Sequence, residues 1–382
     1  MKSKYLGFLL LICVILSCNQ NNIKHSKPLE IVDIKNAFEN RKPININDIS
    51  KDCKYVVLES TNESLIGNNF TVYSDDQYLI AIDRQRMLLF DRKSGNFIRK
   101  IGNLGNGPDE YSKPYSKIPY DEEKKVVYAA RSRERYEYDL NGLLINKKKG
   151  PELAFDFVNI DENTYASFIE NYMGDEKKKI IIFNKEDSII KIFPNYLSYP
   201  FKGSINVLFI NSWFYKLNKQ LYFCERYNDT LFNITSNSLI PRFVFDKGLY
   251  SFPYELRGSS ISGKYFLTEN ILESSKYLFY TFWFDKKIYT AVYDKERKTT
   301  NVNDYTGESG KGYINNINDF VPLELSSFNE KGELTCTIDA YKIRLWFETN
   351  SDKFEKLPED LQKLKKISES DNPIVVIARL KE

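Results

Sequence analysis

Short apolar runs recur along the chain, and most are followed by a polar turn and a second apolar run. Five of them end in an aromatic residue followed by Asp or Asn: Phe90-Asp91, Tyr138-Asp139, Phe183-Asn184, Phe232-Asn233 and Tyr293-Asp294. The spacings between these pairs are 48, 45, 49 and 61 residues. The runs are rich in β-branched and aromatic residues and apolar on both faces, which is typical of strands buried between stacked sheets. A repeat of about 50 residues with three or four strands predicts the blade of a β-propeller.

Five complete blades follow from this repeat. The first has expected strands at residues 70–73, 78–83, 87–91 and 97–101. The next four are expected at 115–148, 154–193, 212–245 and 265–302. Asn141-Gly142 is the clearest turn signal, because both residues tolerate the positive φ that a type I′ hairpin needs.

The sixth unit departs from the repeat. Strands are expected at 318–322 and 333–339, but a helix then replaces the aromatic hairpin. Pro358 lies near its start, and its apolar face carries Leu361, Leu364 and Ile367.

One strand is left over at each end of the chain, at 55–58 and at 374–380. Because a ring must seal its edges, we expect these two strands to pair. The sequence therefore predicts an all-β fold: a six-bladed β-propeller closed by pairing N-terminal and C-terminal strands, with a short C-terminal helical insertion. A seven-bladed ring with a degenerate blade at 28–50 is the alternative, and it is disfavoured because that segment has too little strand pattern.

The N-terminus has the pattern of a secretory signal. Lys2 and Lys4 precede an apolar run at 5–16, which is too short for a comfortable membrane span. The following Ser17-Cys18 completes a tetrapeptide that resembles the bacterial lipobox, in which the cysteine is cleaved to become residue one and is acylated.

This pattern predicts three segments: a lipoprotein signal peptide at 1–17, a lipidated cysteine with tether and lead-in at 18–50, and the propeller at 51–382. Several acyl chains anchor a protein stably. Asn19 is not the aspartate typical of inner-membrane retention, and the first acid is as far along as Glu30. We therefore expect an outer-membrane lipoprotein that faces the periplasm rather than the cell surface.

Composition narrows the chemistry. The chain has 382 residues with 27 Tyr, 26 Phe and 3 Trp, but its one histidine, His25, lies in the tether. A two-histidine metal site and a Ser-His-Asp triad are therefore excluded from the folded domain. The 55 basic and 52 acidic side chains nearly balance, which argues against nucleic acid as a partner.

Three of the five cysteines belong to the predicted propeller. Cys224 lies in an apolar run and is expected to be a buried small hydrophobe. A bridge between Cys53 and Cys336 is one pairing that an oxidising compartment allows.

Four segments together resemble a known family. They are 55–59, 97–102 with the following 105–111, 227–232 and 371–376. The chain resembles the six-bladed β-propeller lipoproteins of Gram-negative envelopes, which are distantly similar in shape to TolB-like and NHL propellers. Asp109 stands where that family commonly has a second glycine, so the turn is expected to differ there. The resemblance implies the fold and lipidation but no reaction, and an association with glycan or nutrient uptake suggests binding.

The candidate ligand residues lie in two places. The first is the glycine-rich segment 102–111, where an inter-blade turn is favoured over a phosphate loop because no helix follows. Its residues Asp109, Glu110 and Tyr111 are expected at one mouth of the ring, where they could face a ligand. Arg131 and Arg133 alternate with Arg135, so a single strand would place all three on one face, where they could hold a carboxylate or sulfate.

Other features have simpler explanations. The clusters 213–215, 282–284 and 346–347 are expected to pack between blades, because consecutive aromatics in a strand point to opposite faces. No cofactor is evident, although calcium in the central channel is compatible with a propeller whose oxygen ligands converge there.

The function expected from these patterns is a lipid-anchored, non-catalytic binding or scaffolding protein of the cell envelope. Its expected partners are the membrane, through the lipid anchor, and an envelope protein or glycan ligand. The alternative is a carbohydrate-active lyase or hydrolase that uses Tyr, Arg and carboxylates at the propeller mouth. Two carboxylates about 5–9 Å apart at the mouth would favour hydrolysis.

Overall fold

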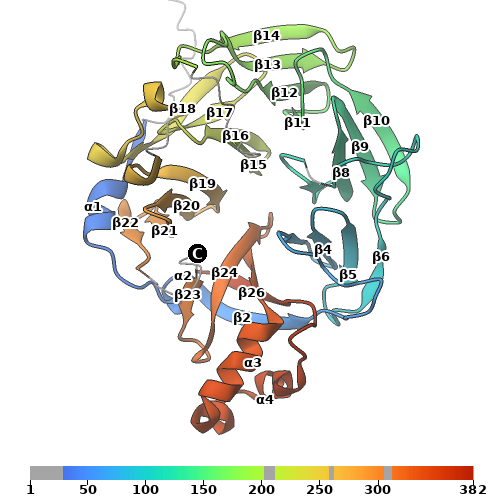
Figure 1. Ribbon diagram of the computed structural model, residues 1–382, viewed down its shortest axis with the longest axis vertical. Coiled ribbons are helices and arrows are strands. Elements are labelled where there is room, and N and C mark those ends of the chain that lie inside the picture. Colours follow the sequence, from blue (N-terminus) through green and yellow to red (C-terminus); the bar gives the residue numbers. More distant parts are fainter. Residues whose placement is uncertain (1–28, 115, 202–210, 258–261, 305–311, 382) are drawn as a thin grey trace, which may run out of the picture.

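The repeated apolar runs pair into antiparallel sheets arranged around a central axis. The computed structural model describes residues 29–114, 116–201, 211–257, 262–304 and 312–381, and within them six separate sheets form a ring (Figure 1). The predicted six-bladed β-propeller is therefore confirmed, and the alternative ring of seven blades is wrong.

Four blades have the expected four strands. The first contains β3 (Thr71–Ser74), β4 (Tyr78–Ile82), β5 (Met87–Asp91) and β6 (Phe97–Lys100). The second contains β7 (Tyr120–Asp121), β8 (Val126–Arg131), β9 (Glu134–Asp139) and β10 (Leu144–Lys149). The third contains β11 (Val158–Asn159), β12 (Thr164–Phe168), β13 (Lys178–Asn184) and β14 (Ile189–Pro194). The fifth contains β19 (Leu267–Glu273), β20 (Tyr277–Phe284), β21 (Lys287–Asp294) and β22 (Thr299–Val302).

The fourth blade gains a strand from the N-terminal segment. Its own strands are β15 (Ser212–Leu217), β16 (Gln220–Glu225), β17 (Thr230–Ile234) and β18 (Leu239–Asp246). Outside them, β1 (Glu30–Asp33) pairs parallel with β18. Three short 3-10 helices follow β18: η1 (Gly248–Tyr250), η2 (Tyr254–Leu256) and η3 (Ser262–Lys264).

The sixth blade closes the ring. Its strands are β23 (Gly312–Asn315), β24 (Phe320–Phe328), β25 (Glu333–Ile338), β26 (Ile374–Leu380) and, outermost, β2 (Ser50–Val57). Val57 lies opposite Ile374 and Tyr55 opposite Val376, which confirms the predicted pairing of the two ends of the chain. Strand β24 is longer than the expected 318–322, and β23 was not expected.

The helical insertion lies between β25 and β26 and projects from the ring (Figure 1). It contains α3 (Ala340–Thr349), η4 (Ser351–Lys356), α4 (Glu359–Gln362) and η5 (Lys363–Lys366). Leu361, Leu364 and Ile367 are buried, as the pattern predicted. The assignment of 346–347 to a strand was wrong: these residues belong to α3, whose buried face carries Ile343 and Phe347 one helical turn apart.

The N-terminal segment, up to and including β2, forms a strap across three blades. After β1 come α1 (Ile34–Glu39) and α2 (Ile46–Ile49). Phe38 of α1 packs edge-on against Phe266 and Tyr289 of the fifth blade, with ring centroids 4.9 and 5.1 Å apart. The backbone N–H of Ile44 donates to Asn303 Oδ1 at 2.8 Å. Residues 30–57, called the strap below, therefore join the fourth, fifth and sixth blades.

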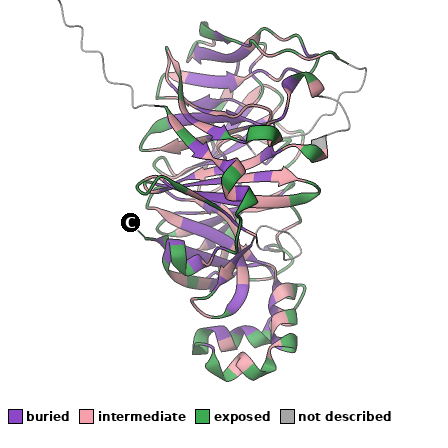
Figure 2. Ribbon diagram, turned by 90° about the vertical axis from the view of Figure 1, so that its left-hand side faces the viewer, coloured by how far each residue is buried: buried purple, intermediate pink, exposed green. Residues whose placement is uncertain are grey.

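The inner strands are packed on both faces of their sheet, which explains why strands such as β4 and β5 are apolar on both faces (Figure 2). In the first blade, Leu79 and Leu88 face Val375 of the sixth blade, whereas Ile80 and Leu89 face the second blade. The alternation of a strand thus divides its side chains between two neighbouring interfaces.

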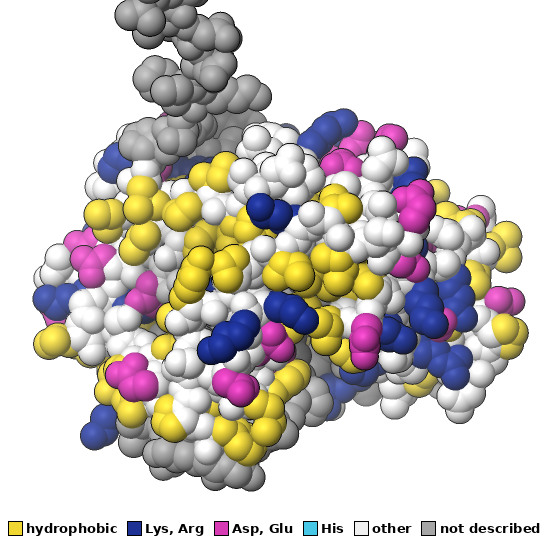
Figure 3. Space-filling model, turned by 90° about the horizontal axis from the view of Figure 1, so that it is seen from above, with side chains coloured by type: hydrophobic (Ala, Val, Ile, Leu, Met, Phe, Trp, Pro, Cys, Tyr) yellow, Lys and Arg dark blue, Asp and Glu magenta, His cyan; other side chains and the backbone are white. Residues whose placement is uncertain are grey.

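The rim of the ring carries exposed apolar side chains among charged ones (Figure 3). On the edge strand β14, Ile189, Ile190 and Ile192 are exposed. Lys191 between them and Pro194 at the strand end limit edge-to-edge association, because a charge or a missing N–H disfavours a further strand.

The three cysteines of the ring are free thiols. Cys53 on β2 and Cys336 on β25 flank β26, so their backbones are separated by two strand spacings, about 9–10 Å. A disulfide needs Cα atoms closer than about 7 Å, so the pairing considered from the sequence does not form. Burial raises the pKa of the Cys53 thiol to about 12. Cys224 is fully buried, as expected.

The closing strand gives a direct test of this architecture. Val56 of β2 is 2% exposed and lies opposite Val375, so Val56→Ala is expected to lower the free energy of unfolding by about 2 kcal/mol through lost burial and a residual cavity. Urea denaturation of the purified protein measures this change. The neighbouring Val57 is 47% exposed, and Val57→Ala should have less than half that effect. Equal effects of the two variants would contradict the closure by β2.

Candidate functional site

The glycine-rich connection between β6 and β7 lies on the face of the ring that carries the inter-blade connections, here called the loop face. Tyr111 is fully buried in this connection, and its ring meets Tyr138 edge-on at 5.9 Å. Its hydroxyl donates to the Gln85 carbonyl at 3.3 Å. Tyr111 therefore packs between the first two blades and exposes no surface to a ligand.

The two acids beside Tyr111 organise the turn itself. Glu110 Oε2 accepts the Gly107 N–H at 2.8 Å, and a Cβ added to Gly105 would lie 1.9 Å from the same oxygen. The Asp109 carbonyl accepts the Tyr138 hydroxyl at 2.8 Å. These glycines thus leave room for the chain's own carboxylate, which fits an inter-blade turn.

The arginines of the second blade are not on one strand. Arg131 ends β8, and the chain reverses at Ser132 and Arg133 before β9 begins. The expectation that Arg131, Arg133 and Arg135 share a strand face was therefore wrong. Arg131 Nη1 donates to the carbonyl of Gly107 at 3.1 Å. Arg131 and the glycine-rich segment, the two predicted ligand sites, therefore lie side by side. The guanidinium, however, stabilises the turn.

Three acids on the loop face of the third to fifth blades are paired with cations. The pairs are Glu170 with Arg257, Glu225 with Lys179, and Glu269 with Arg226. The Arg257 guanidinium also lies over the rings of Tyr199, Tyr227 and Tyr254, at 4.8 to 5.7 Å from their centroids. These contacts fix loops of neighbouring blades to one another.

On the opposite face, called the hairpin face, turns of non-adjacent blades meet. Glu123 of the second blade pairs with Lys219 of the fourth, with Oε1 and Nζ 2.6 Å apart. The Glu330 N–H of the sixth blade donates to Glu122 Oε2 at 2.8 Å. These contacts bridge the ring at this face, and they bring Glu122 and Glu330 together. Burial, with the Glu330 charge adding to it, raises the pKa of Glu122.

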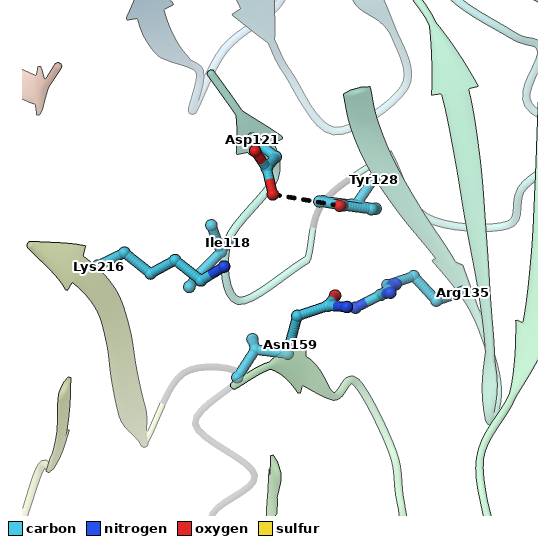
Figure 4. Close-up of a pocket in the computed structure, with 7 residues that line it drawn as sticks. Ile118, Asp121, Tyr128, Arg135, Asn159 and Lys216 are labelled. Atoms are coloured by element: carbon cyan, nitrogen blue, oxygen red, sulfur yellow. Dashed lines mark hydrogen bonds between the residues drawn. The ribbon is translucent and has the colours of Figure 1, made fainter. Parts of the chain in front are cut away.

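Between the two faces, residues of the second, third and fourth blades enclose a small polar niche (Figure 4). Its cavity volume is about 10 Å³, and its polar lining comes from Asp121, Tyr128, Arg135, Asn159 and Lys216. Ile118 and Val158 complete the wall. Such a volume holds about one water-sized group. Sequence reasoning named none of these residues except Arg135.

Asp121, Ile118 and Lys216 are each partly exposed, so the niche opens to solvent. The Asp121 carboxylate accepts the Lys124 N–H at 2.9 Å and the Tyr128 hydroxyl at 3.5 Å. The niche therefore combines one carboxylate with two cationic donors.

Calcium in the central channel stays a prediction. No group of three or more His, Cys, Asp or Glu side chains within these ranges is placed to hold a metal. Three acids on the loop face lie in ion pairs with lysine or arginine. No helix in the described part of the chain is long and apolar enough to cross a membrane.

Residues 29–379 match a protein family defined by a domain of unknown function, DUF4934. Because the match covers most of the chain, the protein belongs to this family. No curated protein matches the chain.

One solved structure supports the fold. It is from Bacteroides fragilis NCTC 9343, is named as an exported protein, and superposes with a TM-score of 0.67 at 16% identity, covering 92% of this chain and all of that one. A Thermus thermophilus protein described as an oxidoreductase (glucose dehydrogenase) gives a TM-score of 0.39 at 13% identity, covering 85% of this chain and 100% of that one. The second likeness is too weak to support an argument.

The burial of Tyr111 predicts a structural role. Tyr111→Ala should lower the free energy of unfolding by about 3–4 kcal/mol, whereas Tyr111→Phe, which loses only the bond to Gln85, should lower it by about 1 kcal/mol. Chemical denaturation of both variants tests this. A Tyr111→Ala protein as stable as the parent would show that the side chain is not part of the inter-blade core.

The raised pKa of Glu122 predicts a pH dependence. The folded state holds the proton of Glu122 more tightly than the unfolded state does. The free energy of unfolding therefore falls as the pH rises from the ordinary pKa of 4.5 through the raised pKa of this carboxyl group. Glu122→Gln should therefore raise the Tm at pH 7 by about 1–2 °C, and by less at pH 4.

Glu123→Gln is the matched control, because the hydrogen bond from Lys219 lowers the pKa of Glu123. It should not raise the Tm at pH 7. Thermal melts of the two variants at both pH values measure these changes. An equal rise in Tm for Glu122→Gln at pH 4 and pH 7 would contradict the raised pKa of Glu122.

Proposed function

We propose that this protein is a lipid-anchored propeller of the cell envelope that binds a ligand or partner without transforming it. The lipobox-like residues that end in Cys18 lie outside the described residues, so the support for anchoring comes from the sequence pattern. The relative named as an exported protein supports export. The outer membrane, with the propeller in the periplasm, follows from Asn19 and from the absence of acids directly after Cys18.

One observation carries the binding role: three acids on the loop face lie in ion pairs, whereas the ammonium of Lys216 beside the axis does not. Glu170, Glu225 and Glu269 each lie in an ion pair. An acid–base pair for glycoside cleavage needs free carboxyl groups facing the substrate. By contrast, the Lys216 side chain makes no hydrogen bond or ion pair with any residue that the structure describes. Unpaired donors suit recognition of a ligand's oxygen atoms.

The alternative, a lyase or hydrolase acting on carbohydrate, has one supporting feature. Glu122 and Glu330 meet at the hairpin face, and burial raises the pKa of both carboxyl groups. Raised carboxyl pKa values occur in general acids, but they also occur in structural clusters. The bridged turns around these two acids favour the structural explanation.

The expected partners are an envelope protein or a glycan, together with the membrane itself. Nucleic acid is not expected, because acidic and basic side chains are nearly equal in number. An association with glycan or nutrient uptake remains part of the proposal.

Anchoring can be tested with two cysteine variants of the whole chain. Cys18→Ser should abolish incorporation of labelled palmitate and release the protein from the membrane fraction, because the acylated thiol is gone. Cys13→Ser, in the apolar part of the signal, should leave both properties unchanged. Labelling that persists in Cys18→Ser would refute the lipid anchor, and release by protease treatment of intact cells would refute the periplasmic orientation.

Binding is tested with the purified lipidated protein in detergent. A pull-down from solubilised envelope, combined with a glycan array, should capture a partner without product formation. Turnover of a glycan that is lost in Glu122→Gln would replace the binding role with the enzymatic alternative. Absence of both capture and turnover would contradict the proposed function.

A further inference from the structure

Lys216 is the first of two cationic groups that line the niche beside the axis. It stands near the end of β15 in the fourth blade and is partly exposed. Burial lowers the pKa of its ammonium, and the charges of Lys124 and Arg135 lower it further, whereas Asp121 and Glu330 raise it.

Arg135 is the second, and its contacts leave Nε without a partner among the described residues. Only 3% of its surface is exposed. Nη1 donates to the Phe157 carbonyl at 3.2 Å, and Nη2 donates to Glu137 Oε1 at 2.7 Å. The guanidinium also lies over Tyr128, 4.4 Å from the ring centroid. Nε is buried and has no hydrogen-bond partner among the described residues.

A buried donor without a partner destabilises a protein by about 1–3 kcal/mol, so its persistence calls for an acceptor. The rigid fork of Arg135 is fixed by Phe157, Glu137 and the stacked ring, so the guanidinium cannot turn to satisfy Nε elsewhere.

Figure 4 shows how the lining groups are arranged. Lys216 approaches the niche from one side and Arg135 from the other. Asn159 lies beside the guanidinium, and Asp121 lies across the niche from Asn159. The space is the size of one oxygen-bearing group, and it opens to solvent along partly exposed Lys216 and Asp121. A ligand would therefore place one terminal oxygen in the niche and keep the rest of its atoms outside.

The charges of the lining select the ligand class. Arg135 and Lys216 offer N–H donors, which require an acceptor oxygen, and an ionised oxygen makes the stronger bond. Asp121 borders the same space, so a doubly charged oxyanion would be repelled. Asp121 already accepts hydrogen bonds from the Lys124 N–H and the Tyr128 hydroxyl. Its remaining lone pairs can accept a further hydrogen bond from a ligand hydroxyl.

We infer that the niche enclosed by the second, third and fourth blades is a binding subsite for a hydroxylated carboxylate, of which a uronic acid residue is the simplest glycan example. The carboxylate faces Arg135 and Lys216, and a neighbouring hydroxyl donates to Asp121. This inference rests on the proposed binding function and names the ligand class for it.

Isothermal titration of the detergent-solubilised full chain tests the subsite with D-glucuronate, D-glucose and sulfate as probes. Glucuronate is expected to bind at least about tenfold more tightly than glucose, because a charge-assisted hydrogen bond contributes about 1.5–3 kcal/mol. Sulfate should bind more weakly than glucuronate. Equal binding of glucose and glucuronate, tighter binding of sulfate, or no binding of glucuronate would each overturn the inference.

Variants place the binding in the niche. Lys216→Met keeps the length of the side chain and should weaken glucuronate binding by about tenfold or more. Lys219→Met is the matched control, since Lys219 belongs to the same hairpin but its exposed ammonium pairs with Glu123 outside the niche. It should bind glucuronate as the parent does. Thermal melts establish that both variants fold, and Asp121→Asn offers an independent change that should strengthen sulfate binding, because it removes the charge that repels a doubly charged oxyanion.

Failure of this subsite can be separated from failure of the proposed function. Suppose that Lys216→Met captures the same envelope partner or glycan as the parent, and that glucuronate binds no more tightly than glucose or sulfate. The protein is then a binding protein, but the niche is not its subsite. If the parent captures nothing, the proposed function itself fails.

Discussion

The pairing of β2 with β26 is the interaction on which the rest of the ring depends. Each blade packs the faces of its sheet against its two neighbours, so the last blade needs an outer strand, and that strand comes from the opposite end of the chain. Without β2, β26 would become an exposed edge, and Val56 and Val375 would lose their shared core with the first blade. The strap extends the same closure to the fifth and fourth blades through Phe38 and β1.

Close packing of sheets on both faces leaves few places where polar groups can act. Along the inner strands both faces are apolar, and several charged side chains on the loop face are paired with one another. Near the axis the geometry differs, because the blades converge there and β7 and β11 are only two residues long. The niche arises there, where Arg135 reaches past its own blade and Lys216 enters from the fourth blade.

The candidate ligand residues illustrate how local pattern and packing compete. The glycine-rich turn around Glu110 carries the residue types of an anion site, yet its own carboxylate occupies the space that the glycines leave. Tyr111 has the amphipathic ring of a ligand contact but is fully buried. For Arg131 and Arg133, the error was to extend a strand through a tight turn, since Ser132 adopts a positive φ that the sequence does not require.

The chain's periodicity by itself determined the number of blades, most hairpins, the apolar helix face at Leu361 and the partner of the closing strand, because burial between sheets imposes a repeat that is visible locally. Tertiary structure alone decided the features that depend on distant segments. Strands β1 and β23 form because a neighbouring strand offers unpaired N–H and C=O groups, not because of their own pattern. Likewise, no sequence spacing could show that Arg135 and Lys216 share a niche, since three blades separated by long stretches of chain must first close around the axis.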